Sequence, residues 1–162
     1  MKKKEQGMVI VEFAIIAVAL VIVLFTVMEL GRLIWIWNTA DEATRRGARV
    51  AAVCPIGDQA VPRVTVFADP GGGGSANSPI LPGLNANTHV TVEYLDENGG
   101  TPPGGATFEN TRYVRVSLSG YPVTLMIPFI EITINLPAFE TTIPSESLGF
   151  VPDTADFRCL MP

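Results

Sequence analysis

Residues 8–28 read MVIVEFAIIAVALVIVLFTVM, and this stretch decides the class of the protein. Its 21 residues contain a single charged side chain, Glu12. A helix that crosses the hydrocarbon core of a bilayer needs about 20 consecutive apolar residues, so the stretch has the length and composition of a membrane span. The chain of 162 residues is 48% hydrophobic and 17% charged, against about 25% charged in ordinary soluble domains. The sequence therefore argues against a purely cytosolic soluble protein.

Three lysines, Lys2, Lys3 and Lys4, directly precede the apolar stretch. Positive charges beside a span favour the cytoplasmic side, so we expect a cytoplasmic N-terminus and residues 29–162 outside the cytoplasm. The alternative is a secretory signal peptide, whose apolar region is usually about 7–15 residues long. The one suitable cleavage motif, Ala17-Val18-Ala19, lies inside the apolar stretch, and cutting there would leave an apolar N-terminus. We therefore predict a retained anchor in the cytoplasmic membrane.

The helix is predicted to continue beyond the membrane. Over residues 29–54 there is no proline, and small or apolar residues recur at spacings of three and four, which is typical of one helix face. Asp41 and Arg45 form an acid–base pair four residues apart, which also favours a helix. Pro55 ends it, because the residue before a proline avoids the α region. Trp35 lies where the helix would leave the outer leaflet, as aromatic residues do at membrane interfaces. The small or apolar residues that recur at spacings of three and four are Leu33, Trp37, Ala40, Ala43, Gly47 and Val50.

Residues 55–162 have a different composition, with all 13 prolines and 12 of the 15 glycines. Both residue types disfavour helices, so we expect none there. Five short stretches instead read as strands, and the alternation in residues 89–95 and 112–118 suggests an antiparallel hairpin. The predicted fold class is α+β: a long N-terminal helix, transmembrane and then amphipathic, that carries a small antiparallel β-sheet as a head. The five stretches are residues 63–67, 89–95, 112–118, 123–127 and 131–136.

The two cysteines, Cys54 and Cys159, both lie on the predicted outer side of the membrane. In an oxidising compartment an even count suggests a disulfide, and two cysteines allow only one pairing. The alternative is a pair of buried free thiols. A bridge that closes a loop of about 100 residues contributes up to ~4–5 kcal/mol in the chain-entropy model. Such a bridge, together with the apolar face of the helix, would stabilise a head too small to bury a large core.

Charge and motif content exclude several functions. The chain has 11 basic and 16 acidic residues, a net charge of −5, and an acidic body repels nucleic acid. The single histidine, His89, has no cysteine or carboxylate cluster spaced to share a metal with it. The glycines at 71–74 are not followed by the Gly-Lys-Ser/Thr of a phosphate-binding loop. We therefore predict no metal site, no cofactor and no enzyme.

Glu12 is the unusual residue of the apolar stretch. A charged side chain costs about 2.5–3.5 kcal/mol near the centre of a membrane on insertion scales, and less near an edge, where its carboxylate can reach water. No Lys or Arg lies between Met8 and Gly31, so a cationic partner within the membrane must come from another chain or from a new N-terminus. Gly7 precedes the stretch, and Glu12 is the fifth residue after it. Besides the spacing of Gly7 and Glu12, four short segments between residues 12 and 52 are distinctive. They are Glu12-Phe13, Glu29-Leu30-Gly31-Arg32-Leu33, Asn38-Thr39-Ala40 and Arg46-Gly47-Ala48-Arg49-Val50-Ala51-Ala52.

This pattern resembles type IV prepilins, and in these segments it resembles TadE-like proteins, the minor pilins or pseudopilins of Tad (Flp-type) adherence pili. The resemblance covers residues 7–54 and implies a type IV pilin-like fold. It implies that a prepilin peptidase cuts between Gly7 and Met8, and that Glu12 then recruits the subunit by meeting the freed amine of a neighbour. Phe13 departs from the tyrosine that pilins of this branch often carry there. Gly7 and Met8 are the expected processing residues, and Glu12 and Phe13 the expected subunit-assembly residues.

The function that the resemblance implies is that of a structural, non-catalytic pilus component in the bacterial cytoplasmic membrane. A minor role fits better than that of the main filament subunit, because major Flp pilins are little more than the helix. The expected partners are the membrane, other pilin subunits, the prepilin peptidase and the pilus assembly platform. The alternatives are an uncleaved signal-anchored envelope protein whose head binds a ligand or partner, and an anchored extracytoplasmic enzyme. The expected divisions are 1–7 leader, 8–28 transmembrane helix, 29–54 amphipathic continuation and 55–162 extracytoplasmic head.

Overall fold

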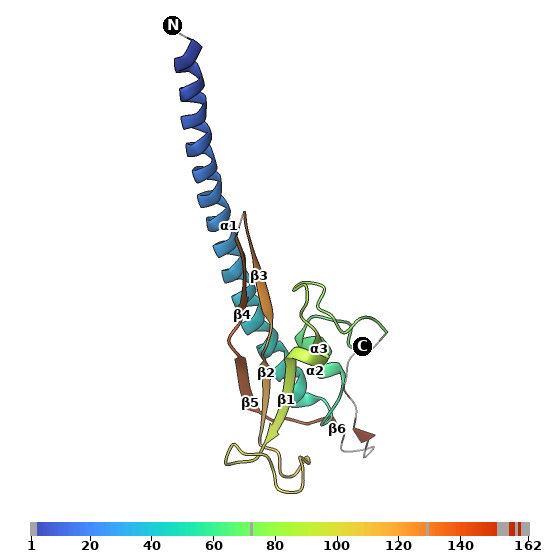
Figure 1. Ribbon diagram of the computed structural model, residues 1–162. Coiled ribbons are helices and arrows are strands. Elements are labelled where there is room, and N and C mark those ends of the chain that lie inside the picture. The colour runs from blue at the N-terminus through green and yellow to red at the C-terminus, as the bar shows by residue number, and fades with distance from the viewer. Residues whose placement is uncertain (1–2, 72, 129, 152–155, 158, 160–162) are drawn as a thin grey trace. The chain divides into compact units, whose positions relative to one another are not determined.

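The computed structural model describes residues 3–71, 73–128, 130–151, 156–157 and 159 (Figure 1). The chain divides into two compact units. The first contains Met1–Ile36 and Val123–Ile134, and the second contains Trp37–Pro122 and Asn135–Pro162. The predicted α+β fold is confirmed, since a long N-terminal helix is followed by a small antiparallel sheet.

The N-terminal helix α1 covers Lys3–Val53, 51 residues without interruption. It begins before the apolar stretch and ends at the predicted place, directly before Cys54 and Pro55. It is the one described helix that is long and apolar enough to cross a membrane, and its most apolar 18-residue window has no buried residue. The apolar side chains of this window are exposed on the protein and are stable only in an apolar environment. Their exposure agrees with a membrane anchor.

Within the second unit, α1 is amphipathic as predicted. Ala40, Ala43, Ala48 and Ala51 are fully buried, at spacings that place them on one face of the helix. The predicted ion pair is present on the solvent side, with Arg45 Nη2 2.9 Å from the Asp41 carboxylate. The small size of the buried residues lets other backbone segments approach the helix closely.

A three-stranded antiparallel sheet forms the centre of the head. Its strands are β1 (Val90–Leu95), β2 (Tyr113–Leu118) and β5 (Phe139–Pro144), in the order β1-β2-β5. The predicted hairpin is confirmed, because Val90 pairs with Leu118 and Leu95 with Tyr113. Strand β5 was not expected from its sequence, FETTIP, which is short and half polar.

Residues 63–67 were predicted as a strand, and this is wrong. They lie largely in α2, a short helix over Ala60–Thr65, and a second short helix, α3, covers Ala86–His89. The expectation of no helix beyond Pro55 is therefore also wrong. The Asp58 carboxylate accepts a hydrogen bond from the Ala60 backbone N–H at 2.8 Å, which satisfies one of the free donors at the start of α2. The helical spacing of Val61, Val64 and Thr65 then buries all three side chains.

Two smaller sheets complete the structure. Strands β3 (Pro122–Ile127) and β4 (Ile130–Asn135) pair with each other, close to the predicted 123–127 and 131–136. They provide the non-helical part of the first unit. The short strands β6 (Phe150–Val151) and β7 (Asp156–Phe157) form an antiparallel pair near the C-terminus.

The core of the head forms between the sheet and the end of α1, as expected for a head that cannot bury enough surface by itself. Residues 146–149 cross the C-terminal end of α1, where the Gly149 and Leu148 N–H groups donate to the carbonyls of Val53 and Ala52. Carbonyls at a helix end lack partners within the helix, so this segment caps α1. The buried core residues are Ala48, Ala51, Cys54, Val61, Val114, Val116 and Leu148.

Candidate assembly site

The predicted processing residues lie on an open part of α1. Met8 is 76% exposed, and a Cβ placed on Gly7 would meet no described atom within 4 Å. Glycine inside a helix is destabilising by about 1 kcal/mol relative to alanine, so the helix opens more readily at Gly7 than it would with alanine there. A protease needs an extended backbone, and this position offers both space and low helix stability.

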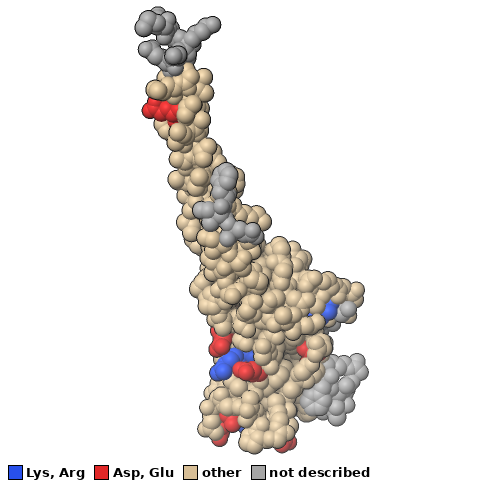
Figure 2. Space-filling model, viewed as in Figure 1, with Lys and Arg blue, Asp and Glu red and all other residues tan. Residues whose placement is uncertain are grey.

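Glu12 lies one helical turn beyond Met8, and residues four apart share a helix face. Its side chain is exposed, as is that of Phe13, which is 72% exposed. Among the side chains that the structure describes, no ion pair involves Glu12. Figure 2 shows one acidic patch on an otherwise uncharged length of helix. A carboxylate in this setting can pair with a cation from outside the chain.

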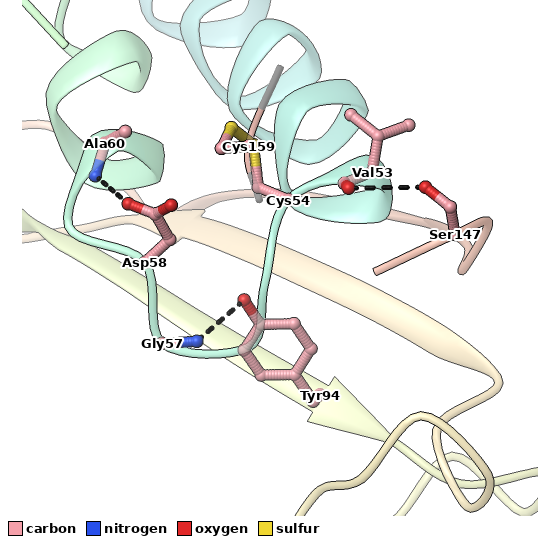
Figure 3. Close-up of a disulfide and its surroundings, with 8 residues drawn as sticks. All are labelled: Val53, Cys54, Gly57, Asp58, Ala60, Tyr94, Ser147 and Cys159. Carbon is pink, nitrogen blue, oxygen red and sulfur yellow. Dashed lines mark hydrogen bonds between the residues drawn. A yellow bond between two sulfur atoms is a disulfide. The ribbon is translucent and has the colours of Figure 1, made fainter. Parts of the chain in front are cut away.

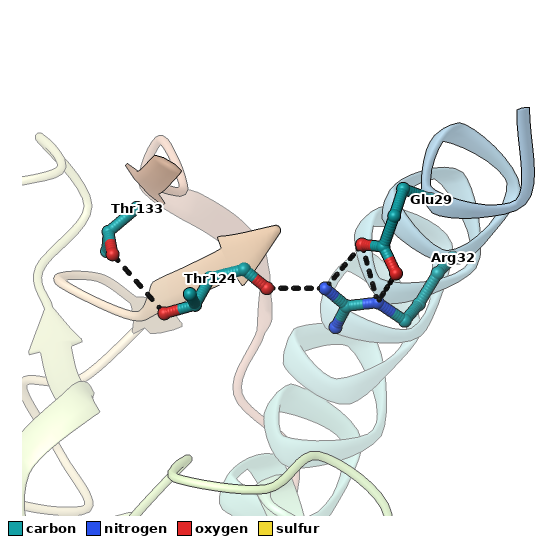
Figure 4. A network of polar contacts seen from close by, with 4 residues as sticks. All are labelled: Glu29, Arg32, Thr124 and Thr133. Atoms are coloured by element: carbon teal, nitrogen blue, oxygen red, sulfur yellow. Dashed lines mark hydrogen bonds and ion pairs between the residues drawn. The ribbon is translucent and has the colours of Figure 1, made fainter. Parts of the chain in front are cut away.

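A second acidic residue, Glu29, lies just after the predicted span and is only 9% exposed. Its carboxylate is held by Arg32, with Nη2 at 2.8 Å and Nε at 3.0 Å from the same oxygen (Figure 4). The same Arg32 guanidinium donates to the carbonyl of Thr124 in β3, and the Met126 backbone N–H donates to Glu29. This bridge between helix and hairpin was missed from the sequence. The signal that could have revealed it is the acid–base spacing of three residues.

The predicted disulfide is present in the structure, where Cys54 is bonded to Cys159 (Figure 3). Cys54 is fully buried at the end of α1, and the bridge holds Cys159 there. Beside it, the Gly57 N–H donates to the Tyr94 hydroxyl at 3.3 Å. Burial raises the pKa of Tyr94 above its ordinary value, so its hydroxyl stays protonated at neutral pH.

His89 has a structural place in the head. Its Nδ1 accepts a hydrogen bond from the Asn85 backbone N–H at 3.0 Å, and its ring packs edge-on against Tyr121. Among the described residues, no group of three or more His, Cys, Asp or Glu side chains is placed to hold a metal.

A shallow hollow of about 690 Å³ lies at one end of the sheet. The Thr111 hydroxyl at this hollow is buried and has no hydrogen-bond partner among the described residues. The lining combines acidic, basic, aromatic and hydroxyl side chains. The lining residues are Glu97, Phe108, Glu109, Thr111, Arg112, Tyr113, Pro144, Ser145 and Glu146.

Comparison with known proteins gives one positive result. Residues 7–49 match the family model described as TadE-like protein. No curated protein and no solved structure matches the chain. The match begins at Gly7 and includes Glu12, Glu29 and Arg32, but it ends before the head. Over residues 7–49, which carry Glu12, Glu29 and Arg32, the chain is therefore similar to TadE-like proteins.

Proposed function

We propose that this chain is a minor pilin or pseudopilin of a Tad-type pilus, structural and non-catalytic, with a head outside the cytoplasmic membrane. The observation that carries the proposal is the arrangement at the start of α1. An exposed glycine, an exposed apolar helix and a single carboxylate five residues after the glycine all fall inside the TadE-like match.

Cleavage after Gly7 would supply a cationic partner for Glu12. It removes Lys2, Lys3 and Lys4 and creates an α-amine on Met8, whose ordinary pKa of about 7.7–8.0 keeps it mostly protonated at neutral pH. An ammonium group then lies at the N-terminal end of every subunit. The amine of one subunit can pair with Glu12 of its neighbour when the helices pack side by side.

The decisive experiment is the intact mass of the full chain, extracted from the membrane of a host that has a prepilin peptidase. We expect a species that begins at Met8. Gly7→Leu should block processing, whereas Gly31→Leu, a matched glycine of α1 with equally open surroundings, should leave it unchanged. A wild-type chain that still carries the three lysines would refute the pilin proposal.

The second candidate is an uncleaved, signal-anchored envelope protein with a binding head. The hollow at the end of the sheet favours it, because charged and aromatic side chains, among them Glu97, Arg112 and Tyr113, line it and could contact a ligand. The same mass measurement separates the two candidates, since only the pilin is processed.

A further inference from the structure

The β3–β4 hairpin lies along α1 with its turn directed toward the N-terminal end of the helix (Figure 1). Two contacts establish this direction. Arg32 reaches Thr124, and Glu29 receives the N–H of Met126, so advancing along β3 means moving back along α1. Val123 and Leu125, which alternate with these residues, are 3% and 9% exposed.

The covered face of α1 shows how far the hairpin reaches. Ile22, Thr26, Glu29, Leu33 and Ile36 are less exposed than their neighbours and recur at spacings of four and three. Such spacing defines one helix face. Strands rise about 3.3 Å per residue and helices about 1.5 Å, so Pro128, two residues beyond Met126, lies about four helix residues further toward the N-terminus. That level, near residue 25, is inside the predicted span of 8–28.

The composition of the hairpin suits this depth. Residues 121–130, which read YPVTLMIPFI and contain β3, carry no charge, and Glu131 in β4 is the one charged residue of the hairpin sequence. Met126 is 72% exposed, and Ile132 and Ile134 in β4 are 44% and 41% exposed. Apolar side chains exposed beside a membrane span are stabilised when lipid replaces the water around them.

Two of the polar groups on the edge of β3 have partners on α1. A sheet edge is costly near lipid, because its N–H and C=O groups have no water to bind. The Thr124 carbonyl and the Met126 N–H belong to residues two apart, so they point from the same edge of the strand. Arg32 and Glu29 bind these two groups and replace a neighbouring strand.

We infer that the turn of the β3–β4 hairpin dips into the outer leaflet of the membrane and is a second membrane contact beside α1. The Glu29–Arg32 pair holds the hairpin on the helix at the point where the helix leaves the bilayer. The inference rests on the proposed membrane anchoring of α1, but not on cleavage after Gly7. The ligand is the lipid surface of the bilayer.

Spin labelling of the full chain tests the depth of the turn. Cys54 and Cys159 are bonded, so no native thiol competes with an introduced cysteine. We would label T124C, M126C and P128C, with one chain per nanodisc of phosphatidylethanolamine and phosphatidylglycerol. Accessibility to oxygen, which concentrates in lipid, is compared with accessibility to a water-soluble nickel complex. We expect the oxygen-to-nickel ratio to rise several-fold from position 124 to position 128.

Two further labels calibrate the result. V27C on the exposed side of α1 reports the span itself, and N98C in the β1–β2 connection reports water. Ratios at positions 126 and 128 equal to that of N98C would overturn the inference while leaving the span intact. Protection from both reagents, lost when the chains are diluted, would show a contact between copies and would overturn it as well. An oxygen-to-nickel ratio at V27C as low as that at N98C would instead contradict the membrane anchor.

The helix–hairpin bridge has its own test. R32Q should increase the mobility of the label at position 126, because the carbonyl of Thr124 loses its donor and Glu29 loses its partner. R45Q breaks the exposed pair with Asp41 on the same helix and should leave that label unchanged. Unchanged mobility in R32Q would show that the bridge does not hold the hairpin.

Discussion

At the scale of single residues, Gly47 shows how closely α1 and α2 pack. A Cβ on Gly47 would lie 2.1 Å from Oγ1 and 3.0 Å from Cβ of Thr65, which is fully buried. The Thr65 hydroxyl donates to the Val61 carbonyl at 2.9 Å, so its side chain is held in place. The absence of a side chain at position 47 thus sets the distance between the two helices.

Gly47→Ala should therefore destabilise the head. We expect a loss of about 1–3 kcal/mol in the free energy of unfolding, as is usual for overpacking a filled site. The measurement is thermal unfolding of the full chain in detergent, followed by near-ultraviolet circular dichroism.

Gly31→Ala is the matched control, because a Cβ at position 31 meets no described atom within 4 Å. There the better helix propensity of alanine should stabilise α1 by up to about 1 kcal/mol. A melting temperature of Gly47→Ala at or above that of the wild type would contradict the packing argument.

At the scale of elements, the disulfide joins the end of α1 to a segment 105 residues later in the chain. Its loss should release the C-terminal segment and reduce the stability of the head by up to ~4–5 kcal/mol, because the unfolded chain regains the entropy of an open loop. The double variant C54A/C159A should melt at a lower temperature and lose its C-terminal residues first in limited proteolysis.

The bridge itself is checked on protein extracted from the envelope. Non-reducing gel mobility and peptide mapping should show Cys54 linked to Cys159. Recovery of both thiols in freely alkylated form would reject the bridge in the cell and leave the free-thiol alternative.

At the scale of the whole molecule, we predict that Glu12 acts in contacts between chains. The described part of α1 offers it no ion pair, and no Lys or Arg lies between Met8 and Gly31. We predict that Glu12→Ala still inserts and is still cleaved, but fails to enter the assembly. Glu12→Asp, which keeps the charge, should assemble better than Glu12→Ala.

Crosslinking or co-purification with other pilus components measures incorporation, and intact mass measures cleavage in the same samples. Incorporation of Glu12→Ala at the level of the wild type would refute the pairing of Glu12 with a neighbour's amine. Loss of both cleavage and incorporation would place Glu12 in peptidase recognition instead.

The sequence by itself determined the parts of this protein that rest on local composition. An uninterrupted run of apolar residues specifies an exposed helix, and Pro55 specifies its end, because neither depends on distant partners. The alternation in residues 89–95 and 112–118 likewise specified a hairpin, since its two strands are close in the chain. The TadE-like pattern from Gly7 onward is also local.

Only the tertiary structure decided the rest. The stretch 63–67 is too short for its hydrophobic pattern to distinguish a strand from a helix. Packing against Gly47 selects the helix. Strand β5 is short and half polar, and it forms because β2 offers it an edge. The bridge from Glu29 and Arg32 to Thr124 joins residues 92 positions apart. No local pattern encodes such a contact, because the free energy that favours it comes from burial between segments that meet only after the chain has folded.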